Sequence, residues 1–489
     1  MKESAKSSGK VKSPDKYNIL LFTIALAAFM GSLDVTIVNI ALPSISSGYG
    51  ISTGLVSWVS LVYLIVLSSF MLVSGKIAAS CGYKKMFIRG FVIFTAGSLL
   101  CGLAPLLFSA FLPLIIFRIF QALGASVMSA LAPGMVALYL PEDMRTKGLS
   151  FIVIMASAGL AAGPFLGGIL TEYAGWHWIF LINVPVGILA VICGVLLIPK
   201  DTVKGNLKGF DIAGSFLILM SLSAGIFAVN MGSQLGWGSG VITGTAFVSV
   251  ISLVLFYINE KRHKNPLLDP EMFKNKAFSL ANSAAAVIML VFTGASFLFP
   301  FYLEYIKGLS PSVSGVILII PSLAMIAGGF LAGAVSDKAG SRNLCTVSAV
   351  LCGISFIFFA LLSETTSYLF LFAGLFLLGL STGIFIPANS SLLFSHSKGY
   401  EPGVVSALMV TVRDTGASFG IAVFETVFAA FVYSEISAAA PALINTAVLA
   451  EGFKFTFLAG AVFCVFAVIF SFYSKEKRNH KKAEGRSTP

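Results

Sequence analysis

Fourteen long apolar runs dominate this sequence, the first at 18–43 and the last at 453–473. Each run has about the 20 residues that a helix needs to cross the hydrocarbon core of a bilayer, or more. Charged residues make up only 11% of the 489 residues and hydrophobic residues 57%, whereas soluble domains carry roughly 25% charge. The pattern therefore predicts an all-α polytopic membrane protein with fourteen transmembrane helices. It excludes one large soluble core.

The positive charges fall on one side of the predicted bundle. Most of the 32 lysine and arginine residues lie in the two tails and in every second loop, while Lys307, and Lys454 at a span end, fall on the other side. Such asymmetry marks the inner face of a membrane. It predicts a multi-pass protein of the cell membrane with both termini in the cytoplasm. The net charge of +11 is thus read as a topogenic signal and an attraction to membrane lipids, not as a nucleic-acid surface.

Several classes of site are missing from the sequence. The six cysteines and four histidines are scattered without metal-ligand spacing, so no metal site is expected. No Gly-x-x-x-x-Gly-Lys-Ser/Thr run is present, so direct use of ATP is not expected. The basic amino-terminal tail leads into a full-length span, and we expect no removable signal peptide. No cofactor is predicted.

Two motifs recur at nearly the same separation. The glycine-rich loops that begin at Gly75 and Gly333 lie 258 residues apart, and the Gly-x-x-x-Gly pairs that begin at Gly159 and Gly416 lie 257 residues apart. Two unrelated motifs that share one offset indicate two homologous six-helix halves. Repeated halves around a central site are typical of secondary transporters.

The repeat and the polar linkers predict five segments. These are a cytoplasmic tail (1–17), an N-terminal six-helix half (18–199), a linker with two extra transmembrane helices (200–276), a C-terminal six-helix half (277–474) and a basic cytoplasmic tail (475–489). Within the linker, 260–276 is predicted to form a short helix on the inner surface.

Asp34 and Arg118 are opposite charges inside apolar runs. Asp34 lies about 13 Å below the outer end of the first span and Arg118 about 12 Å deep in the fourth, at a rise of 1.5 Å per residue. Charged groups within a membrane face the protein interior and pair there. Two interpretations stay open: a static ion pair that holds the bundle, or a switchable proton site. Arginine keeps its proton, so Asp34 would be the group that titrates.

The thirteenth span holds a second set of charges. Glu425 stands in its outer third, where it is either a substrate or cation site or a carboxylate that reaches outer water. By the repeat offset it corresponds to Gly168 in the first half. Arg413 and Asp414 lie nearer the inner side and point about 100° apart, so we expect Arg413 to meet a carboxylate or backbone carbonyls across the bundle.

Two patterns suggest moving parts. The fifth span combines a helix breaker with small residues that allow close helix approach, and reads as a pliable contact between the halves: Gly159, Gly163, Pro164, Gly167 and Gly168. At the inner end of the tenth span, Asp337 and Arg342 form a candidate cytoplasmic latch, with a solvated loop charge as the alternative. The equivalent position in the first half is Ala79, which lacks the carboxylate.

Aromatic and amide side chains supply candidates for a cavity wall, with interface anchoring as the alternative reading of the aromatic ones. These are Trp58, Tyr63, Phe299, Tyr302 and Asn389.

Four motifs in order resemble the fourteen-helix drug:proton antiporters of the major facilitator superfamily. They are Leu33 to Pro43, Arg118 to Gly124, Gly159 to Gly168, and Trp176 to Pro185, in which His177 replaces the usual arginine. The likeness covers almost the whole chain. The first cytoplasmic-loop motif departs from the family pattern at Ala79 and Tyr83.

The resemblance implies a major facilitator fold, Asp34 protonated during exchange and Arg118 as its modulator. It adds Asn39 and Gln121 as substrate-binding candidates beside Glu425. It also implies a proton gradient as the energy source and a monomer.

The sequence thus predicts a proton-coupled antiporter that exports lipophilic, cationic compounds, a multidrug efflux protein of the antibiotic-resistance type. An exporter of an endogenous metabolite or lipid is the alternative. A non-transporting membrane sensor is a more remote one.

Overall fold

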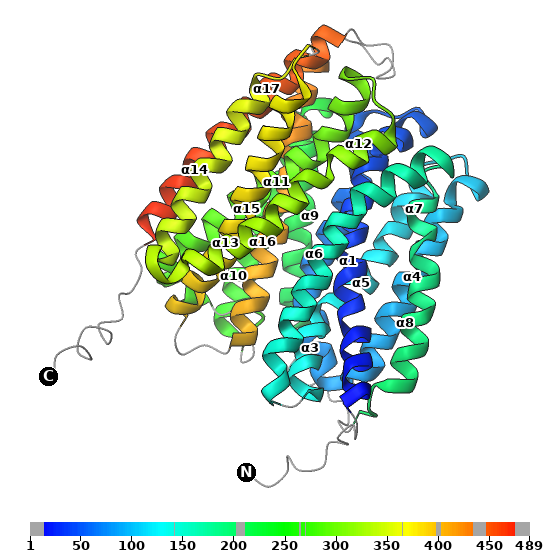
Figure 1. Cartoon of the computed structure of the whole chain (residues 1–489), viewed down its shortest axis with the longest axis vertical. Coiled ribbons are helices and arrows are strands. Elements are labelled where there is room, and N and C mark those ends of the chain that lie inside the picture. Colours follow the sequence, from blue (N-terminus) through cyan, green and yellow to red (C-terminus); the bar gives the residue numbers. More distant parts are fainter. Residues whose placement is uncertain are drawn as a thin grey trace, which may run out of the picture.

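The computed structural model describes residues 14–140, 142–201, 211–263, 266–268, 270–363, 365–397, 402–433 and 446–474. Within these ranges the chain is helical and forms no strand. Fourteen helical stretches of the described part are long and apolar enough to cross a membrane. The predicted number of spans is therefore confirmed, and Figure 1 shows them packed into one elongated bundle.

The helices fall into three groups along the chain. The first group is α1 (Pro14–Tyr49), α2 (Thr53–Val56), α3 (Trp58–Cys81), α4 (Tyr83–Leu107), α5 (Leu112–Tyr139), α6 (Glu142–Tyr173), α7 (Trp178–Leu181) and α8 (Asn183–Leu197). The second is α9 (Ile212–Leu235), α10 (Gly240–Arg262) and the 3₁₀-helix η1 (Pro270–Lys274). The third is α11 (Lys276–Phe301), the π-helix η2 (Tyr302–Ile306), α12 (Pro311–Ile317), α13 (Ile319–Ala339), α14 (Ser341–Ala360), α15 (Tyr368–His396), α16 (Pro402–Tyr433) and α17 (Thr446–Tyr473).

Because the number of spans is even, α1 begins and α17 ends on the same side of the bundle, which we call the termini side. The opposite side is the far side. The short helix predicted within 260–276 is η1. That the termini side faces the cytoplasm stays a prediction, as do the segment boundaries.

The first and third groups repeat one packing scheme. In the first group α1 packs on α6, α4 on α5, α3 on α5 and α4 on α8. In the third group the matching pairs are α11 on α16, α14 on α15, α13 on α15 and α14 on α17. This recurrence is what a duplicated six-helix unit produces, and we call the two groups the N-half and the C-half.

The hairpin of α9 and α10 joins the bundle through α9. This helix packs against α3 of the N-half and α16 of the C-half, and it lies between the two halves in Figure 1. Its start is fixed by Asp211, whose carboxylate accepts hydrogen bonds from the backbone N–H of Gly214 (2.7 Å) and from Asn259 Nδ2 of α10 (2.5 Å). Large apolar side chains of α10, such as Phe247 and Val250, are exposed, as a lipid-facing helix requires.

The halves meet closely on the far side, where α6 crosses α12. A Cβ atom on Gly168 would overlap the carbonyl oxygen of Pro311, and one on Gly315 would overlap that of Pro164. The backbone N–H of Ser312 also donates to the carboxylate of Glu172 at 3.0 Å. Two glycines at this crossing therefore permit a backbone-to-backbone seal on the far side.

On the termini side, the turn between α3 and α4 is capped from a distant segment. Gly82 has a φ of +101°, a conformation that glycine adopts readily. The carboxylate of Asp201 then accepts from the backbone N–H groups of Lys84 (2.9 Å) and Lys85 (3.0 Å) at the start of α4. A carboxylate is favourable at a helix N-terminus. Asp201, which follows α8, therefore supplies a carboxylate to this turn, whereas the nearby position Ala79 has none.

Candidate functional site

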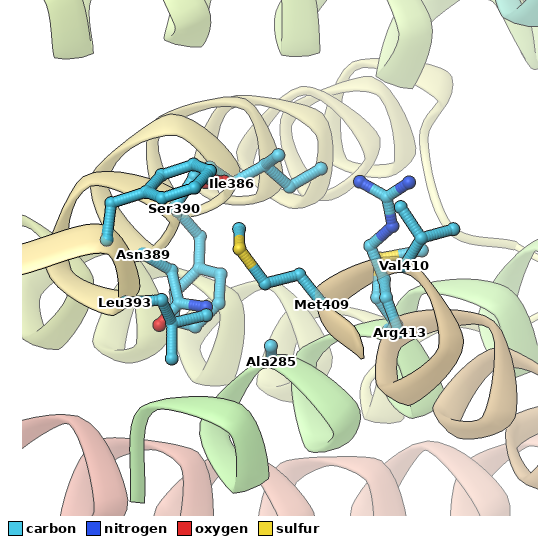
Figure 2. A pocket seen from close by; sticks show the side chains of 11 residues that line it. Ala285, Ile386, Asn389, Ser390, Leu393, Met409, Val410 and Arg413 are labelled. Carbon is cyan, nitrogen blue, oxygen red and sulfur yellow. The ribbon is translucent and has the colours of Figure 1, made fainter. Parts of the chain in front are cut away.

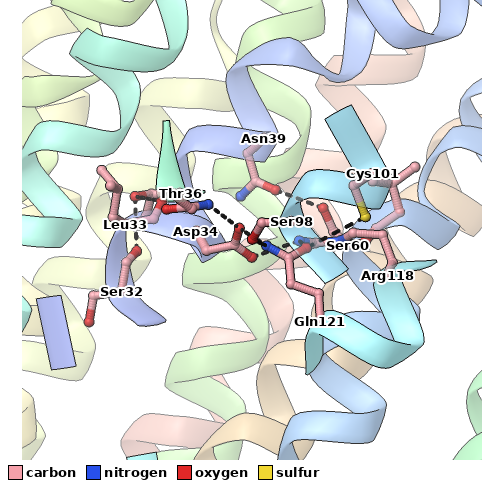
Figure 3. Close-up of polar contacts among 12 residues, drawn as sticks. Ser32, Leu33, Asp34, Thr36, Asn39, Ser60, Ser98, Cys101, Arg118 and Gln121 are labelled. Carbon is pink, nitrogen blue, oxygen red and sulfur yellow. Dashed lines mark hydrogen bonds and ion pairs between the residues drawn. The ribbon is translucent and has the colours of Figure 1, made fainter. Parts of the chain in front are cut away.

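Asp34 and Arg118 form an ion pair in the interior of the N-half. Arg118 Nη1 lies 2.6 Å from Asp34 Oδ2, and the two side chains are 1% and 0% exposed. Arg118 comes from α5 and Asp34 from α1, and the depth that the sequence predicted for each allows this contact (Figure 3). The expected partnership is therefore observed, whereas its role in proton transfer stays a prediction.

Two amides donate to the Asp34 carboxylate, and a hydroxyl accepts from one of these amides. Gln121 Nε2 donates to Asp34 Oδ1 at 2.7 Å and to Ser98 Oγ at 2.7 Å. Asn183 Nδ2 of α8 donates to the same Oδ1 at 3.2 Å. Gln121 Oε1 accepts from Arg118 Nη1 at 2.7 Å. The network therefore joins α1, α5 and α8 at the Asp34 carboxylate and reaches α4 through Gln121.

The guanidinium of Arg118 is held on its other sides as well. Its Nε donates to the carbonyl oxygen of Val59 at 3.0 Å. Its central carbon lies 4.2 Å from the ring centroid of Tyr63 and 5.5 Å from that of Phe180. Arginine retains its charge and cannot follow a proton. Protonation of Asp34 would therefore remove the counter-charge of a buried guanidinium.

Glu425 lies in a different setting, at the junction of the two halves and the hairpin. The side chain is fully buried, Oε2 accepts a hydrogen bond from Asn230 Nδ2 of α9 at 3.3 Å, and the carboxyl group also interacts with the side chain of Thr53. The same nitrogen donates to Ser57 Oγ at 3.2 Å. Glu425 Oε1 has no hydrogen-bond partner, and no ion pair reaches this residue within the described ranges. It does not line either cavity described below.

A small cavity of about 60 Å³ lies between the halves. Its wall combines Thr36, Asn39 and Pro164 of the N-half with apolar C-half residues that include Phe299 and Met325. These residues belong to the far-side portions of their helices. Asn39 also accepts a hydrogen bond from Ser60 Oγ at 3.0 Å. Two of the predicted binding residues, Asn39 and Phe299, therefore line the same cavity from different halves.

A larger cavity of about 230 Å³ lies within the C-half (Figure 2). It is enclosed by the termini-side portions of α11, α15 and α16, so it is on the side opposite the far-side seal. The wall is apolar apart from one amide, one hydroxyl and one guanidinium. The lining residues are Ala285, Met289, Phe385, Ile386, Asn389, Ser390, Leu393, Phe394, Met409, Val410 and Arg413.

Arg413 corrects one expectation. The sequence suggested that it meets a carboxylate or backbone carbonyls, but in the described structure it makes no ion pair and no hydrogen bond, and it lines the larger cavity. The reason is the packing of α16, which lies against α11 and only lightly touches α15. The cavity opens in that gap, and in the described structure no acceptor forms a hydrogen bond with the guanidinium. Asp414, the next residue, is partly buried and is not among the lining residues.

Other predicted residues lie away from both cavities. Tyr63 and Gln121 belong to the ion-pair network. Tyr302 is buried, donates from its hydroxyl to the carbonyl oxygen of Ser363 at 3.0 Å and packs on Phe453. Trp58 packs on Phe227 of α9.

The predicted latch is only partly visible. The side chain of Asp337 falls outside the described part of the chain. The guanidinium of Arg342 lies 4.8 Å from the ring centroid of Phe472. The latch therefore stays a prediction. The glycines of the fifth span, by contrast, face neighbours closely: a Cβ on Gly159 or Gly163 would overlap α1, as one on Gly168 would overlap α12.

Three polar residues of these networks were not singled out from the sequence. Asn183 and Asn230 are amides within apolar runs, and each donates to a buried carboxylate. That isolation is the signal that would have found them, since a lone amide in a span needs a partner. Asp201 follows an apolar run and carries no such signal, because its partner is the end of a distant helix.

Comparison with known proteins gives a consistent picture. The family model described as Major Facilitator Superfamily matches residues 24–421. A riboflavin transporter, RibZ, from Clostridioides difficile is 32% identical over 411 residues, which cover 84% of this chain and 88% of that protein. A multidrug transporter, MdtP, from Bacillus subtilis is 30% identical over 409 residues, which cover 83% and 74% of the two chains.

Among solved structures, a bacterial homologue of the human lysosomal transporter Spinster, in an inward-facing and unoccupied conformation, superposes with a TM-score of 0.67. The match covers 95% of this chain and 98% of that one, at 17% sequence identity. At this identity the likeness concerns the fold alone. It agrees with the recurrence of helix pairs in the two halves.

Proposed function

The chain belongs to the Major Facilitator Superfamily, and from this we propose that it is a proton-coupled antiporter that exports lipophilic small molecules across the cell membrane. The observation that carries the proposal is the buried ion pair of Asp34 and Arg118. A carboxylate kept inside the membrane next to a permanent cation is a typical proton site of secondary transporters. We expect the protein to act as a monomer embedded in lipid, with the proton gradient as its energy source.

The arrangement of the halves supports alternating access. The far side is closed by the contacts of Gly168 and Gly315, while the larger cavity lies on the termini side. In the proposed cycle, substrate enters from the termini side, the protein turns outward, and a proton from outside neutralises Asp34. Loss of the ion pair then favours release and return, because a ligand or proton shifts the balance only through its different affinity for the two states.

The charge of the substrate is a separate matter. The sequence suggested a cation on the strength of Asp34 and Glu425. Both carboxylates are fully buried, and neither lines a cavity in the described part of the chain. A cationic substrate therefore stays a prediction, without support from the wall of the larger cavity.

Everted membrane vesicles with an imposed pH gradient test the proposal. We expect gradient-dependent uptake of lipophilic dyes by vesicles that contain the wild-type protein, and loss of the gradient dependence in Asp34→Asn. A matched control is Glu451→Gln, at an exposed position on α17, which should transport normally. Proton exchange by Asp34→Asn at the wild-type rate would overturn the role of Asp34. The absence of gradient-driven flux across a broad panel would overturn the proposal as a whole.

A second candidate, export of an endogenous metabolite, is favoured by one specific observation. The relative with 32% identity is named as a riboflavin transporter, and the larger cavity offers aromatic rings beside amide and guanidinium groups. If this candidate holds, riboflavin should compete with dye uptake in the same vesicles. Lack of competition by riboflavin at its aqueous solubility limit would exclude this vitamin as the substrate.

A further inference from the structure

The larger cavity contains an unbalanced set of polar groups. Of its lining residues, Arg413 is the only charged one, and no acidic residue belongs to the wall. Within the described structure the guanidinium makes no ion pair and no hydrogen bond. A guanidinium carries five N–H donors in a planar fork that matches carboxylate, sulfonate or phosphate oxygens. The guanidinium therefore brings N–H donors to the cavity that no acceptor of the described structure meets.

Asn389 supplies a second, independent observation. Its side chain is 4% exposed and lines the same cavity, and its Oδ1 has no hydrogen-bond partner. Figure 2 shows Asn389 and Arg413 on opposite sides of the cavity, with Met409 between them. A buried amide oxygen without a partner is unfavourable unless a ligand donor or water meets it. This oxygen is suited to an N–H or O–H group of a bound molecule.

The rest of the cavity wall favours a ligand with a flat, apolar ring system. Phe385 and Phe394 contribute rings, and Met289 and Met409 contribute flexible, polarisable thioethers that adapt to aromatic ligands. The volume of about 230 Å³ lies just below the range of roughly 300–1,000 Å³ that is usual for small-molecule pockets. A fused two-ring compound, or the ring portion of a larger one, matches this space.

We propose that this cavity binds aromatic organic anions, with the anionic group at Arg413 and a donor group of the ligand at Asn389 Oδ1. The inference deepens the proposed transport function, on which it rests for the direction of movement, and it assigns the charge of the cargo. Asp414, the next residue on α16, interacts with the charge of Arg413 through space, but no ion-pair contact joins the two and Asp414 does not line the cavity. The N–H donors of Arg413 therefore remain available to a ligand in the cavity.

Two probes with one ring system test the sign of the charge. 6-Hydroxynaphthalene-2-sulfonate and (6-hydroxynaphthalen-2-yl)trimethylammonium share the ring and the hydroxyl donor, and both are permanently charged. We expect the purified protein in detergent to bind the sulfonate, measured by quenching of naphthol fluorescence, at least tenfold more tightly than the ammonium. Equal binding, tighter binding of the ammonium, or no binding of the sulfonate overturns the proposal.

Variants locate the site. Arg413→Gln should weaken sulfonate binding by about tenfold to a hundredfold, the range expected for loss of a charge-assisted hydrogen bond, and should abolish the preference over the ammonium. Arg413→Lys should restore part of that preference. Arg89→Gln, at an exposed arginine of α4, is the matched control and should behave as wild type. A full preference in Arg413→Gln, with an unchanged melting temperature, contradicts the assignment.

Flux separates this inference from the proposed function. If the sulfonate binds but no pH gradient drives it into everted vesicles, the transport function fails and the binding site stands. If the ammonium moves with the gradient while the sulfonate neither binds nor moves, the site assignment fails and transport stands.

Discussion

The two halves hold their buried carboxylates in opposite ways. Asp34 of the N-half accepts from Arg118, Gln121 and Asn183, and its charge is matched at 2.6 Å. Glu425 of the C-half accepts a bond of 3.3 Å from Asn230, and no cation reaches it in the described structure. Both side chains are fully buried. The halves therefore share a packing scheme but not a chemistry.

The repeat makes the contrast sharper. By its offset, Glu425 of α16 corresponds to Gly168 of α6. Gly168 touches the backbone of α12 and seals the far side, whereas Glu425 meets the inserted hairpin through Asn230 of α9. One topological position thus carries a close glycine contact in one half and an acid in the other. Equivalent positions in the two halves of a duplicated fold can therefore have different roles.

The largest expected effect concerns the matched charge. Arg118→Ala leaves Asp34 buried without a cation and should lower the free energy of unfolding by about 3–5 kcal/mol, measured by denaturant titration in detergent. The double variant Arg118→Ala with Asp34→Asn should recover part of the loss, since no lone charge remains. A double variant no more stable than the single one would contradict the ion-pair account.

The same exchange of acid for amide compares the two sites directly. Asp34→Asn deprives a buried guanidinium of its partner, so we expect a loss of about 3 kcal/mol. Glu425→Gln deprives no cation and keeps the shape of the side chain, so we expect a change within about 1 kcal/mol. The free energies of unfolding of both variants should be measured in the same detergent. Equal losses would contradict the proposed difference between the two carboxylates.

The hairpin contact should have an intermediate effect. Asn230→Ala removes the donor shared by Ser57 and Glu425 and should cost about 1–2 kcal/mol, the usual range for buried hydrogen bonds. Thr243→Ala, at an exposed position of α10, is the matched control within the hairpin. If both variants melt at the wild-type temperature, Asn230 does not tie α9 to the halves.

Among the variants that remove a hydrogen-bond donor, the smallest effect is expected at the edge of the N-half network. Asn183→Ala removes a 3.2 Å bond to an oxygen that Gln121 also serves, so the loss should be about 0.5–1.5 kcal/mol. The melting temperature in detergent is a sufficient measurement. A loss as large as that of Arg118→Ala would mean that the amide, and not the guanidinium, holds the Asp34 carboxylate.

Much of the fold was accessible from the sequence because a bilayer imposes strong rules. Each span must be long, apolar and helical, so the fourteen runs could be counted before any contact was known. The depth of Asp34 and Arg118 followed from the helical rise alone, and their pairing is observed. The side chains around them were harder to predict, since Ser98 reaches Gln121 through the packing of α4, and Asn183 reaches Asp34 through the packing of α8.

The cavity residues show what could not be predicted from residue type and sequence spacing. Phe299, Tyr302 and Asn389 were equal candidates by residue type, yet Asn389 lines the larger cavity, Phe299 the smaller one, and Tyr302 is buried in the C-half. Arg413 was expected to find an acceptor within the bundle and lines a cavity instead. Sequence spacing fixes which face of a helix a residue occupies relative to its neighbours. It leaves open which other helix stands opposite that face.

The sequence by itself determined the class of protein, the number of spans, the repeat and the family, because hydropathy, length and short motifs are local properties of the chain. The tertiary structure decided which charges are matched and which are left over. Asp34 and Glu425 look alike in the sequence, as carboxylates in apolar runs. Only the packing of α5 against α1, of α9 against α16, and the gap between α15 and α16 give Asp34 a cation, Glu425 an amide and Arg413 an open cavity. The energy of a buried charge depends on what surrounds it in space, and those neighbours lie far apart in the chain.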